Sequence, residues 1–243
     1  MNEKEHMTNF LELEKELGYS FKNKKLLMQA LTHSTYAYEQ RENNGSEDNE
    51  RLEFLGDGLL DFVIADRLYE LQNEKDEGYL SKTRALIVCE ATLAEKAIQI
   101  NLGDYLFLGK GELQTGGKEK ASNLANAMEA LFAAVYLDNG FTDAKNTILK
   151  MLESFILQAI AGEIIFDYKS KILEMAQTKR DNIVSFAIVN EDGPVHDRIY
   201  TAALYLNDSY ISEGKGVSKK LAEQAAARTG FERVQMMLYE GSV

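Results

Sequence analysis

The chain has 243 residues, of which 45% are hydrophobic and 27% charged, an ordinary globular composition. Its low glycine and proline content excludes a collagen-like or low-complexity protein, and apolar runs such as Leu131–Leu137 are too short to cross a bilayer. The single cysteine, Cys89, excludes an internal disulfide and a cysteine-rich zinc site. Together with an acidic N-terminus that lacks a signal-peptide pattern, it predicts a cytoplasmic protein.

The net charge is −12, but acidic residues are spread unevenly along the chain. From Asp167 onward, ten basic residues nearly balance eleven acidic ones, whereas the preceding residues carry seventeen basic and twenty-eight acidic side chains. An acidic surface repels nucleic acid phosphates. The first part can nevertheless serve a nucleic acid if its carboxylates hold metal ions that bridge to phosphate.

Residues 1–160 are predicted to form a mainly α domain, a helical bundle. Breaks are expected at the sequence NNGS and at Gly116–Gly117. Cys89 lies within one helical pattern, which predicts a buried and inert thiol. Apolar residues recur at helical spacing in Phe10–Leu17, Leu26–Leu31, Leu52–Leu71, Leu86–Ile98 and Leu124–Leu137.

Residues 167–238 are predicted to form a small α+β domain with the element order α-β-β-β-α. The boundary is placed by the change of hydrophobic period alone, because no Pro/Gly/Ser-rich linker marks it. Asp167 and Ser218 are suitable N-caps for the two helices, which should end near Thr178 and Met237. The strands are expected at Ile183–Val189, at Ile199–Leu206 and around Tyr210–Gly214.

The apolar helix Leu52–Leu71 carries acidic residues on one face. Glu53 and Asp57 are separated by four positions, and Glu50 and Asp61 lie one turn before and after them. A partly buried carboxylate is costly unless it is paired or bound to a cation. Spacing alone does not distinguish such a site from a solvated acidic stripe opposite the core.

A second apolar helix presents Asn126 and Glu129 on one face. If it packs against the first helix, Glu53, Asp57, Asn126 and Glu129 would offer oxygen ligands to one point. Carboxylate-rich oxygen sites suit Mg²⁺, with Mn²⁺ as a substitute, and such ions promote phosphodiester hydrolysis. No small-molecule cofactor is predicted. The loop around Gly109–Gly111 continues with Glu112 and lacks the Walker pattern of a phosphate loop, so it is interpreted as a turn between helices.

With these segments in this order, the sequence resembles bacterial ribonuclease III from about Leu13 to Val234. The stretch NERLEFLGDGLLD is similar to the family's signature helix, with Gly58 where serine is more usual. The other matching segments are ALTHST (Ala30–Thr35), DEGYLSKTRALIV (Asp76–Val88), LGKGELQTGG (Leu108–Gly117), NLANAMEALFAAVYLDNGF (Asn123–Phe141) and, in the tail, DYKSKILEMAQ, GPVH and GKGVSKKLAEQAAAR.

The resemblance implies a Mg²⁺-dependent endoribonuclease for double-stranded RNA. It implies a symmetric homodimer that cuts both strands and leaves 5′-phosphate and 3′-hydroxyl ends with short 3′ overhangs, in the processing of rRNA, mRNA and small RNAs. Catalysis falls to Asp57 and Glu129, and metal binding to these two with Glu53 and Asn126. Further implied roles are acids close to the RNA for Glu50 and Glu77, and a dimer-interface knob for Phe54.

The tail is expected to bind the RNA duplex. One face of its first helix could meet ribose hydroxyls across the minor groove, and the GPVH loop contacts that groove in the resembled domain. Lysines near the start of the last helix are interpreted as phosphate contacts. The residues concerned are Ser170, Glu174, Gln177, His196, Lys215, Lys219 and Lys220.

Asn126 stands where the family usually has aspartate, and it removes one negative charge from the metal site. A catalytically weak or inactive protein that binds double-stranded RNA is therefore an alternative. A helical scaffold with merely surface acids is a second one, although acids inside apolar helices count against it. His33, isolated in sequence from other histidines, is interpreted as a hydrogen-bonded structural residue rather than a general base.

Overall fold

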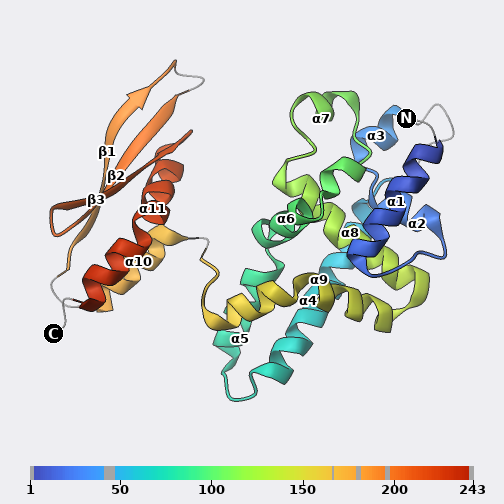
Figure 1. Ribbon diagram of the computed structural model, residues 1–243, viewed down its shortest axis with the longest axis horizontal. Helices are drawn as coiled ribbons and strands as arrows, with labels where there is room; N and C mark the ends of the chain where they lie inside the picture. Colours follow the sequence, from blue (N-terminus) through green and yellow to red (C-terminus); the bar gives the residue numbers. More distant parts are fainter. Residues whose placement is uncertain (1–2, 41–46, 166, 179–181, 195–197, 241–243) are drawn as a thin grey trace. The chain divides into compact units, whose positions relative to one another are not determined.

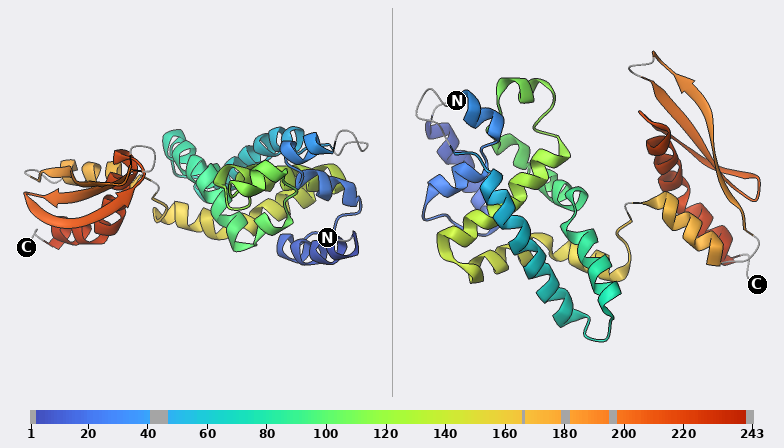
Figure 2. Two further views of the ribbon diagram at one scale, coloured as in Figure 1. Left: turned by 90° about the horizontal axis from the view of Figure 1, so that it is seen from above. Right: turned by 180° about the vertical axis from the view of Figure 1, so that it is seen from behind.

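A computed structural model describes residues 3–40, 47–165, 167–178, 182–194 and 198–240 (Figure 1). The chain divides into two compact units, Met1–Ile164 and Ile165–Val243, called here the first and second unit. The first is helical and the second combines helices with a sheet, as the sequence predicted (Figure 2). None of the helices in the described ranges has the length and apolar character needed to span a membrane.

Helices make up the first unit. Their ranges are α1 Glu3–Leu17, α2 Lys24–Ala30, α3 Ser34–Glu39, α4 Glu50–Leu71, α5 Glu77–Val88, α6 Glu90–Gln99, the 3₁₀ helix η2 Leu102–Tyr105, α7 Lys110–Gln114, α8 Ala121–Asn139 and α9 Phe141–Ala161. Of these, α2, α4 and α8 lie within a few residues of predicted stretches, α1 begins earlier than predicted, and no bounds were predicted for α3, η2, α7 and α9.

Helix α8 forms the centre of the first unit. It packs against α2, α4, α6 and α9, and nearly all of its residues between Asn123 and Val135 are buried. Alanine is frequent in this stretch, so neighbouring helices can approach closely. A helix that is apolar around most of its circumference has to be covered on all sides, which explains its central place.

A close backbone contact joins α4 to α8. A Cβ atom on Gly56 would lie 1.9 Å from the backbone oxygen of Glu129, far inside van der Waals contact. Only glycine allows the two backbones to approach this closely. Gly56 lies between Glu53 and Asp57, so the contact brings the acidic faces of α4 and α8 together.

One predicted helix is interrupted in the structure. The stretch Leu86–Ile98 divides into α5 and α6 at Cys89, whose backbone is extended (φ −72°, ψ 157°). The hydroxyl of Thr92 donates to the carbonyl of Leu86 (2.6 Å) and satisfies a group that the helix end leaves open. Cys89 is therefore half-exposed at a junction, and the expectation of a buried thiol was wrong.

The second unit has the predicted order of elements. They are α10 Tyr168–Thr178, β1 Val184–Asp192, β2 Ile199–Leu206, β3 Ser209–Gly216 and α11 Lys219–Glu240. The sheet is antiparallel in the order β1-β2-β3. Asn207 and Asp208, with φ of 49° and 63°, form the tight turn between β2 and β3.

The two helices of this unit enclose its core. Helix α11 packs on all three strands and on α10, burying residues such as Leu204, Ile172 and Ala226. The predicted caps are confirmed: Asp167 accepts from the backbone N–H of Ser170 (2.9 Å), and Ser218 accepts from that of Leu221 (3.3 Å).

Candidate functional site

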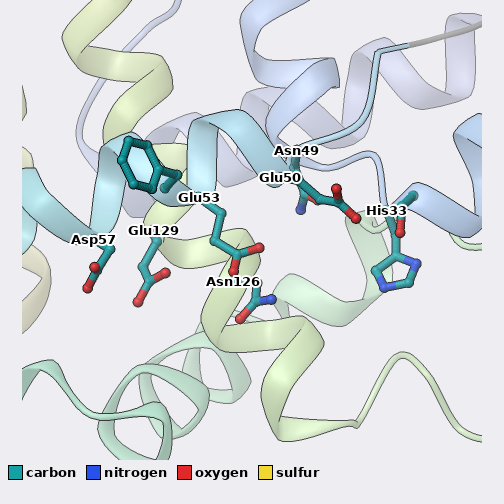
Figure 3. A pocket seen from close by; sticks show the side chains of 9 residues that line it. His33, Asn49, Glu50, Glu53, Asp57, Asn126 and Glu129 are labelled. Carbon is teal, nitrogen blue, oxygen red and sulfur yellow. The ribbon is translucent and has the colours of Figure 1, made fainter.

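A pocket of about 640 Å³ lies where α4, α8 and the start of α3 meet (Figure 3). In Figure 3 Asp57 and Glu129 lie side by side at one end, Glu53 and Asn126 are central, and Glu50 and His33 lie at the other end. The lining residues are His33, Ser34, Asn49, Glu50, Glu53, Phe54, Asp57, Asn126 and Glu129. The packing of the two acidic helices, which the sequence left open, thus brings all four expected oxygen donors to one pocket.

Two hydrogen bonds from Asn49 fix the end of the pocket where α4 begins. The N–H of Asn49 donates to the carbonyl of Thr32 (2.9 Å), and its side-chain amide donates to the carbonyl of Ala30 (3.3 Å). Asn49 is buried and directly precedes Glu50. These contacts tie the first turn of α4 to the segment that continues into His33 and Ser34.

Crowded carboxylates dominate the electrostatics of the pocket. Burial raises the pKa of Glu129 to about 8, with further contributions from the charges of Asp57, Glu53 and Asp61. The pKa of Glu53 is also raised, first by burial and then by Glu50, although a hydrogen bond with Asn126 opposes the shift. The neighbouring acids therefore make ionisation of Glu129 and Glu53 harder, and a cation in the pocket would relieve this repulsion.

Nearby arginines neutralise other acids. Arg84 of α5 pairs with Asp61 (3.6 Å), and Arg67 pairs with Glu70 (3.3 Å). Within the described part of the chain, no salt bridge involves Glu53, Asp57 or Glu129. The acidic cluster of the pocket is thus left without a protein cation.

The donor set of the pocket is suitable for a hard divalent cation. Three carboxylates and one amide oxygen are the ligands that Mg²⁺ and Mn²⁺ accept, with water completing the shell. Among residues of the described ranges, however, no three His, Cys, Asp or Glu side chains stand close enough to hold a metal ion as they are. Figure 3 shows the carboxylates spread around the pocket, so binding a metal ion requires these side chains to turn towards one another.

The remaining residues expected in the first unit are exposed. Phe54, which is 83% exposed, stands at the rim of the pocket. Glu50 is also exposed and lines the pocket. Glu77 lies outside it, in the first turn of α5, and accepts a hydrogen bond from the Ser81 hydroxyl (2.7 Å).

Sequence reasoning did not assign His33, Ser34 or Asn49 to the pocket. His33 caps α3, because its Nδ1 accepts from the backbone N–H of Thr35 (3.3 Å), which agrees with the predicted structural role. A polar triplet, Thr-His-Ser, before a short helix was the available signal. The distance of His33 and Ser34 from Glu53 in sequence hid their shared location, whereas Asn49 directly precedes α4 and was overlooked.

The segment Leu108–Gly117, called here the GKGE loop, is anchored beside the pocket. Its helix α7 is attached to α3 by a hydrogen bond from the Gly109 N–H to the Thr35 hydroxyl (3.0 Å). Buried Asn123, one turn before Asn126 on α8, donates to the carboxylate of Glu112 (2.9 Å). This bond is the largest cause of the lowered pKa of Glu112. The loop therefore does more than connect helices, because it joins the two elements that flank the pocket.

The residues expected to bind RNA in the second unit are exposed, where they are described. Those on α10 are partly engaged: the Ser170 hydroxyl donates to Asp167 (2.7 Å), and Glu174 pairs with Lys171 (3.3 Å). Lys219 pairs with Glu191 (3.4 Å). His196 lies outside the described residues. The exposed members of the set are Ser170, Glu174, Gln177, Lys215, Lys219 and Lys220.

Family models match both units of the chain. Residues 23–156 match the model described as Ribonuclease-III-like, and residues 168–234 match the double-stranded RNA binding motif.

Curated relatives and solved structures agree with these matches. Ribonuclease 3 of Carboxydothermus hydrogenoformans is 42% identical over 92% of this chain and 95% of its own length. Ribonuclease 3 of Syntrophomonas wolfei is 44% identical, over 93% of this chain and 94% of its own. The solved nuclease domain of ribonuclease III from Campylobacter jejuni is 42% identical, with a TM-score of 0.56 over 60% of this chain and 95% of that chain.

Proposed function

The chain belongs to the ribonuclease III family, and from this membership and its pocket we propose that it hydrolyses double-stranded RNA with the help of Mg²⁺. The observation that carries the proposal is the convergence of four oxygen donors from two helices on one pocket, whose lining includes no Lys or Arg among the described residues. Mn²⁺ is a reasonable substitute for Mg²⁺ because both prefer oxygen ligands. The second unit supplies the affinity for the duplex.

Asp57, Glu129, Glu53 and Asn126 would hold the ion. When bound, it would activate water and neutralise charge on the phosphodiester. Glu129 and Asp57, side by side in Figure 3, are the catalytic pair of this proposal. The hydrogen bond between Asn126 and Glu53 orients the Glu53 carboxylate in the middle of the pocket (Figure 3).

A double-strand cut requires two active sites, which a symmetric homodimer provides. Phe54, nearly fully exposed beside the pocket, is the proposed anchor in a cavity of the partner subunit. The solved nuclease domain of ribonuclease III from Campylobacter jejuni shows structural flexibility in a region involved in dimer formation. Glu50 and Glu77 would lie close to the RNA, and the products would carry 5′-phosphates, 3′-hydroxyls and short 3′ overhangs.

Six residues of the second unit are proposed to hold the duplex, and His196 is proposed as a seventh. Exposed side chains on α10 suit minor-groove hydroxyls, and lysines near the start of α11 suit phosphates. The single cysteine is consistent with a reducing cytoplasm, where rRNA, mRNA and small-RNA precursors are the proposed targets. The six are Ser170, Glu174, Gln177, Lys215, Lys219 and Lys220.

The alternative, a silent binder of double-stranded RNA, rests on Asn126 alone. Identities above 40% over nearly the full length of the enzymes of Carboxydothermus hydrogenoformans and Syntrophomonas wolfei favour an enzyme. An Asn carbonyl oxygen remains a ligand for Mg²⁺. The loss of one charge therefore reduces the attraction for the ion without removing a donor.

The test is Mg²⁺-dependent cleavage of a long RNA duplex by the wild type and by Glu129→Gln. Glu129→Gln removes the half-buried carboxylate and should retain RNA binding while losing cleavage. Asn126→Asp should leave the rate unchanged or raise it. Near wild-type cleavage by Glu129→Gln would contradict the assignment of the site, and a wild type that binds but never cuts would support the silent binder.

A further inference from the structure

His33 caps α3 with its ring nitrogen Nδ1, and its second ring nitrogen, Nε2, is available for another role. It lines the pocket together with Glu50 and Ser34, and Figure 3 places its ring at the end opposite Asp57 and Glu129. Its backbone is held on the other side, because its N–H donates to the carbonyl of Phe107 (3.0 Å). The backbone of His33 is therefore held in place, and its ring projects from there into the rim of the pocket.

The surrounding hydrogen bonds determine which ring nitrogen carries the proton. A backbone N–H can only donate, so Nδ1 must accept from the N–H of Thr35 (3.3 Å). The Thr35 hydroxyl accepts from the Gly109 N–H (3.0 Å) and lies 2.8 Å from Nδ1, to which it can donate its own proton. Nδ1 is thus an acceptor, and the neutral ring carries its hydrogen on Nε2.

Few donors in the pocket remain available for a polyanion. Among the lining residues that carry a side-chain donor, Asn49 is engaged with the carbonyl of Ala30, and Asn126 with Glu53. Neither Nε2 of His33 nor the hydroxyl of Ser34 has a hydrogen bond to another described residue. The hydroxyl of Ser34 rotates freely, whereas the Nε2–H of His33 is directed by the cap.

We propose that His33 is a substrate contact, whose Nε2–H donates to a non-bridging oxygen of an RNA phosphate next to the scissile one. The proposal rests on the proposed function. An RNA strand in this pocket runs past Glu50, Glu53, Asp57 and Glu129, which all repel its phosphates. A donor at the far end offsets this repulsion for the flanking phosphate and fixes the register of the strand relative to the carboxylates.

The variant that separates the two roles of His33 is His33→Asn. Asparagine is a good N-cap and can still accept from the N–H of Thr35, but it has no group at the place of Nε2. His33→Ala removes both functions and serves as the comparison. We expect His33→Asn to keep the wild-type melting temperature, and His33→Ala to lower it.

The readout is cleavage of short duplexes that each carry a single methylphosphonate, at successive positions around the cut. In the wild type, one flanking position should reduce kcat/KM by about tenfold, as expected for the loss of a hydrogen bond to a charged group. His33→Asn should cut the unmodified duplex about tenfold more slowly and lose nothing further at that position. Nothing further is lost there because the variant already lacks the contact that the methylphosphonate removes. At the other positions the wild type and His33→Asn should respond alike.

Other outcomes would overturn the proposal. Wild-type activity of His33→Asn would show that Nε2 makes no contact, and an equal loss on every duplex would show that His33 only positions its surroundings. A parallel series with single 2′-deoxy substitutions detects a ribose contact, which would replace the phosphate assignment. A wild type that cuts no duplex would instead remove the proposed function itself.

Discussion

At the scale of single residues, the carboxylate of Glu129 is partly buried and is repelled by the neighbouring carboxylates. Its pKa is about 8 in the folded protein and 4.5 in the unfolded chain. Between these two pH values the folded protein keeps a proton on Glu129 that the unfolded chain has released. This contribution to stability is fully present below about pH 4.5 and is lost as the pH rises towards 8. The raised pKa of Glu53 has the same sign.

We therefore expect the free energy of unfolding of the metal-free protein to fall between pH 5 and 8, a trend that Glu129→Gln should weaken. Added Mg²⁺ should weaken it as well, because the ion replaces the proton as the compensating charge. Urea titrations at several pH values, with a chelator and with Mg²⁺, measure this. An equally steep fall in Glu129→Gln would show that the trend originates elsewhere.

At the scale of elements, the site depends on the approach of α4 to α8. Gly56 and Gly58 lie on the same helix, two residues apart, but only a Cβ on Gly56 would collide with α8. A Cβ on Gly58 would meet nothing within 4 Å. The two glycines therefore provide a matched pair for testing the packing.

Gly56→Ala should destabilise the protein by about 3 kcal/mol, at the upper end of the range for overpacked cores, and should abolish cleavage. Gly58→Ala should leave stability and activity close to wild type. Thermal unfolding and duplex cleavage of both variants provide the measurement. An active, stable Gly56→Ala protein would mean that the helices separate without disturbing the carboxylates.

The GKGE loop is attached to the start of α8, the helix that α4 contacts through Gly56. Glu112 accepts hydrogen bonds from Asn123 (2.9 Å) and Lys120 (3.1 Å), and both donors lie at the start of α8. Asn123 is 5% exposed, so its amide needs its two acceptors, the carboxylate of Glu112 and the carbonyl of Gly117 (3.0 Å). The loop therefore stabilises the turn of α8 that precedes Asn126.

At the scale of the whole molecule, Phe54 is the proposed link between two subunits. Phe54→Ala should weaken the dimer by roughly 3–5 kcal/mol, the usual cost of emptying an aromatic site. Tyr69→Ala, which removes another exposed aromatic ring from α4, is the control and should have no such effect. Sedimentation over a range of concentrations measures the dimer. A wild-type monomer that cuts both strands would contradict the proposal.

The second unit should bind RNA through ordinary phosphate contacts. Replacing Lys219 and Lys220 by alanine should reduce affinity evenly for all duplex sequences and lower the salt slope by about two contacts. The pair between Lys219 and Glu191 is exposed and gives way at little cost. Lys25→Ala, in the first unit, should leave the slope unchanged.

Salt titrations of the full-length protein in a chelator measure this binding without cleavage. An unchanged slope in the double variant would exclude these lysines as phosphate contacts. DNA and RNA duplexes of one sequence test the role of the 2′-hydroxyl, because minor-groove contacts to it distinguish the two. Equal binding of both would exclude the α10 contacts.

The sequence by itself determined the two-part architecture, because the change from a helical to an alternating period is local. It also determined the caps at Asp167 and Ser218, since a capping side chain acts on its own helix. Spacing placed Glu53 with Asp57, and Asn126 with Glu129, on shared helical faces. None of these conclusions required contact between distant residues.

Only the tertiary structure decided what depends on packing. It brought the two acidic pairs to one pocket because Gly56 lets α4 approach the backbone of Glu129, a contact between residues distant in sequence. It added His33 and Asn49 to that pocket and raised the pKa of Glu129 by burial. It also ended a helix at Cys89, where Thr92 satisfies the carbonyl of Leu86. Burial and close approach arise only when the helices pack together, so the hydrophobic periodicity of a single segment does not predict them.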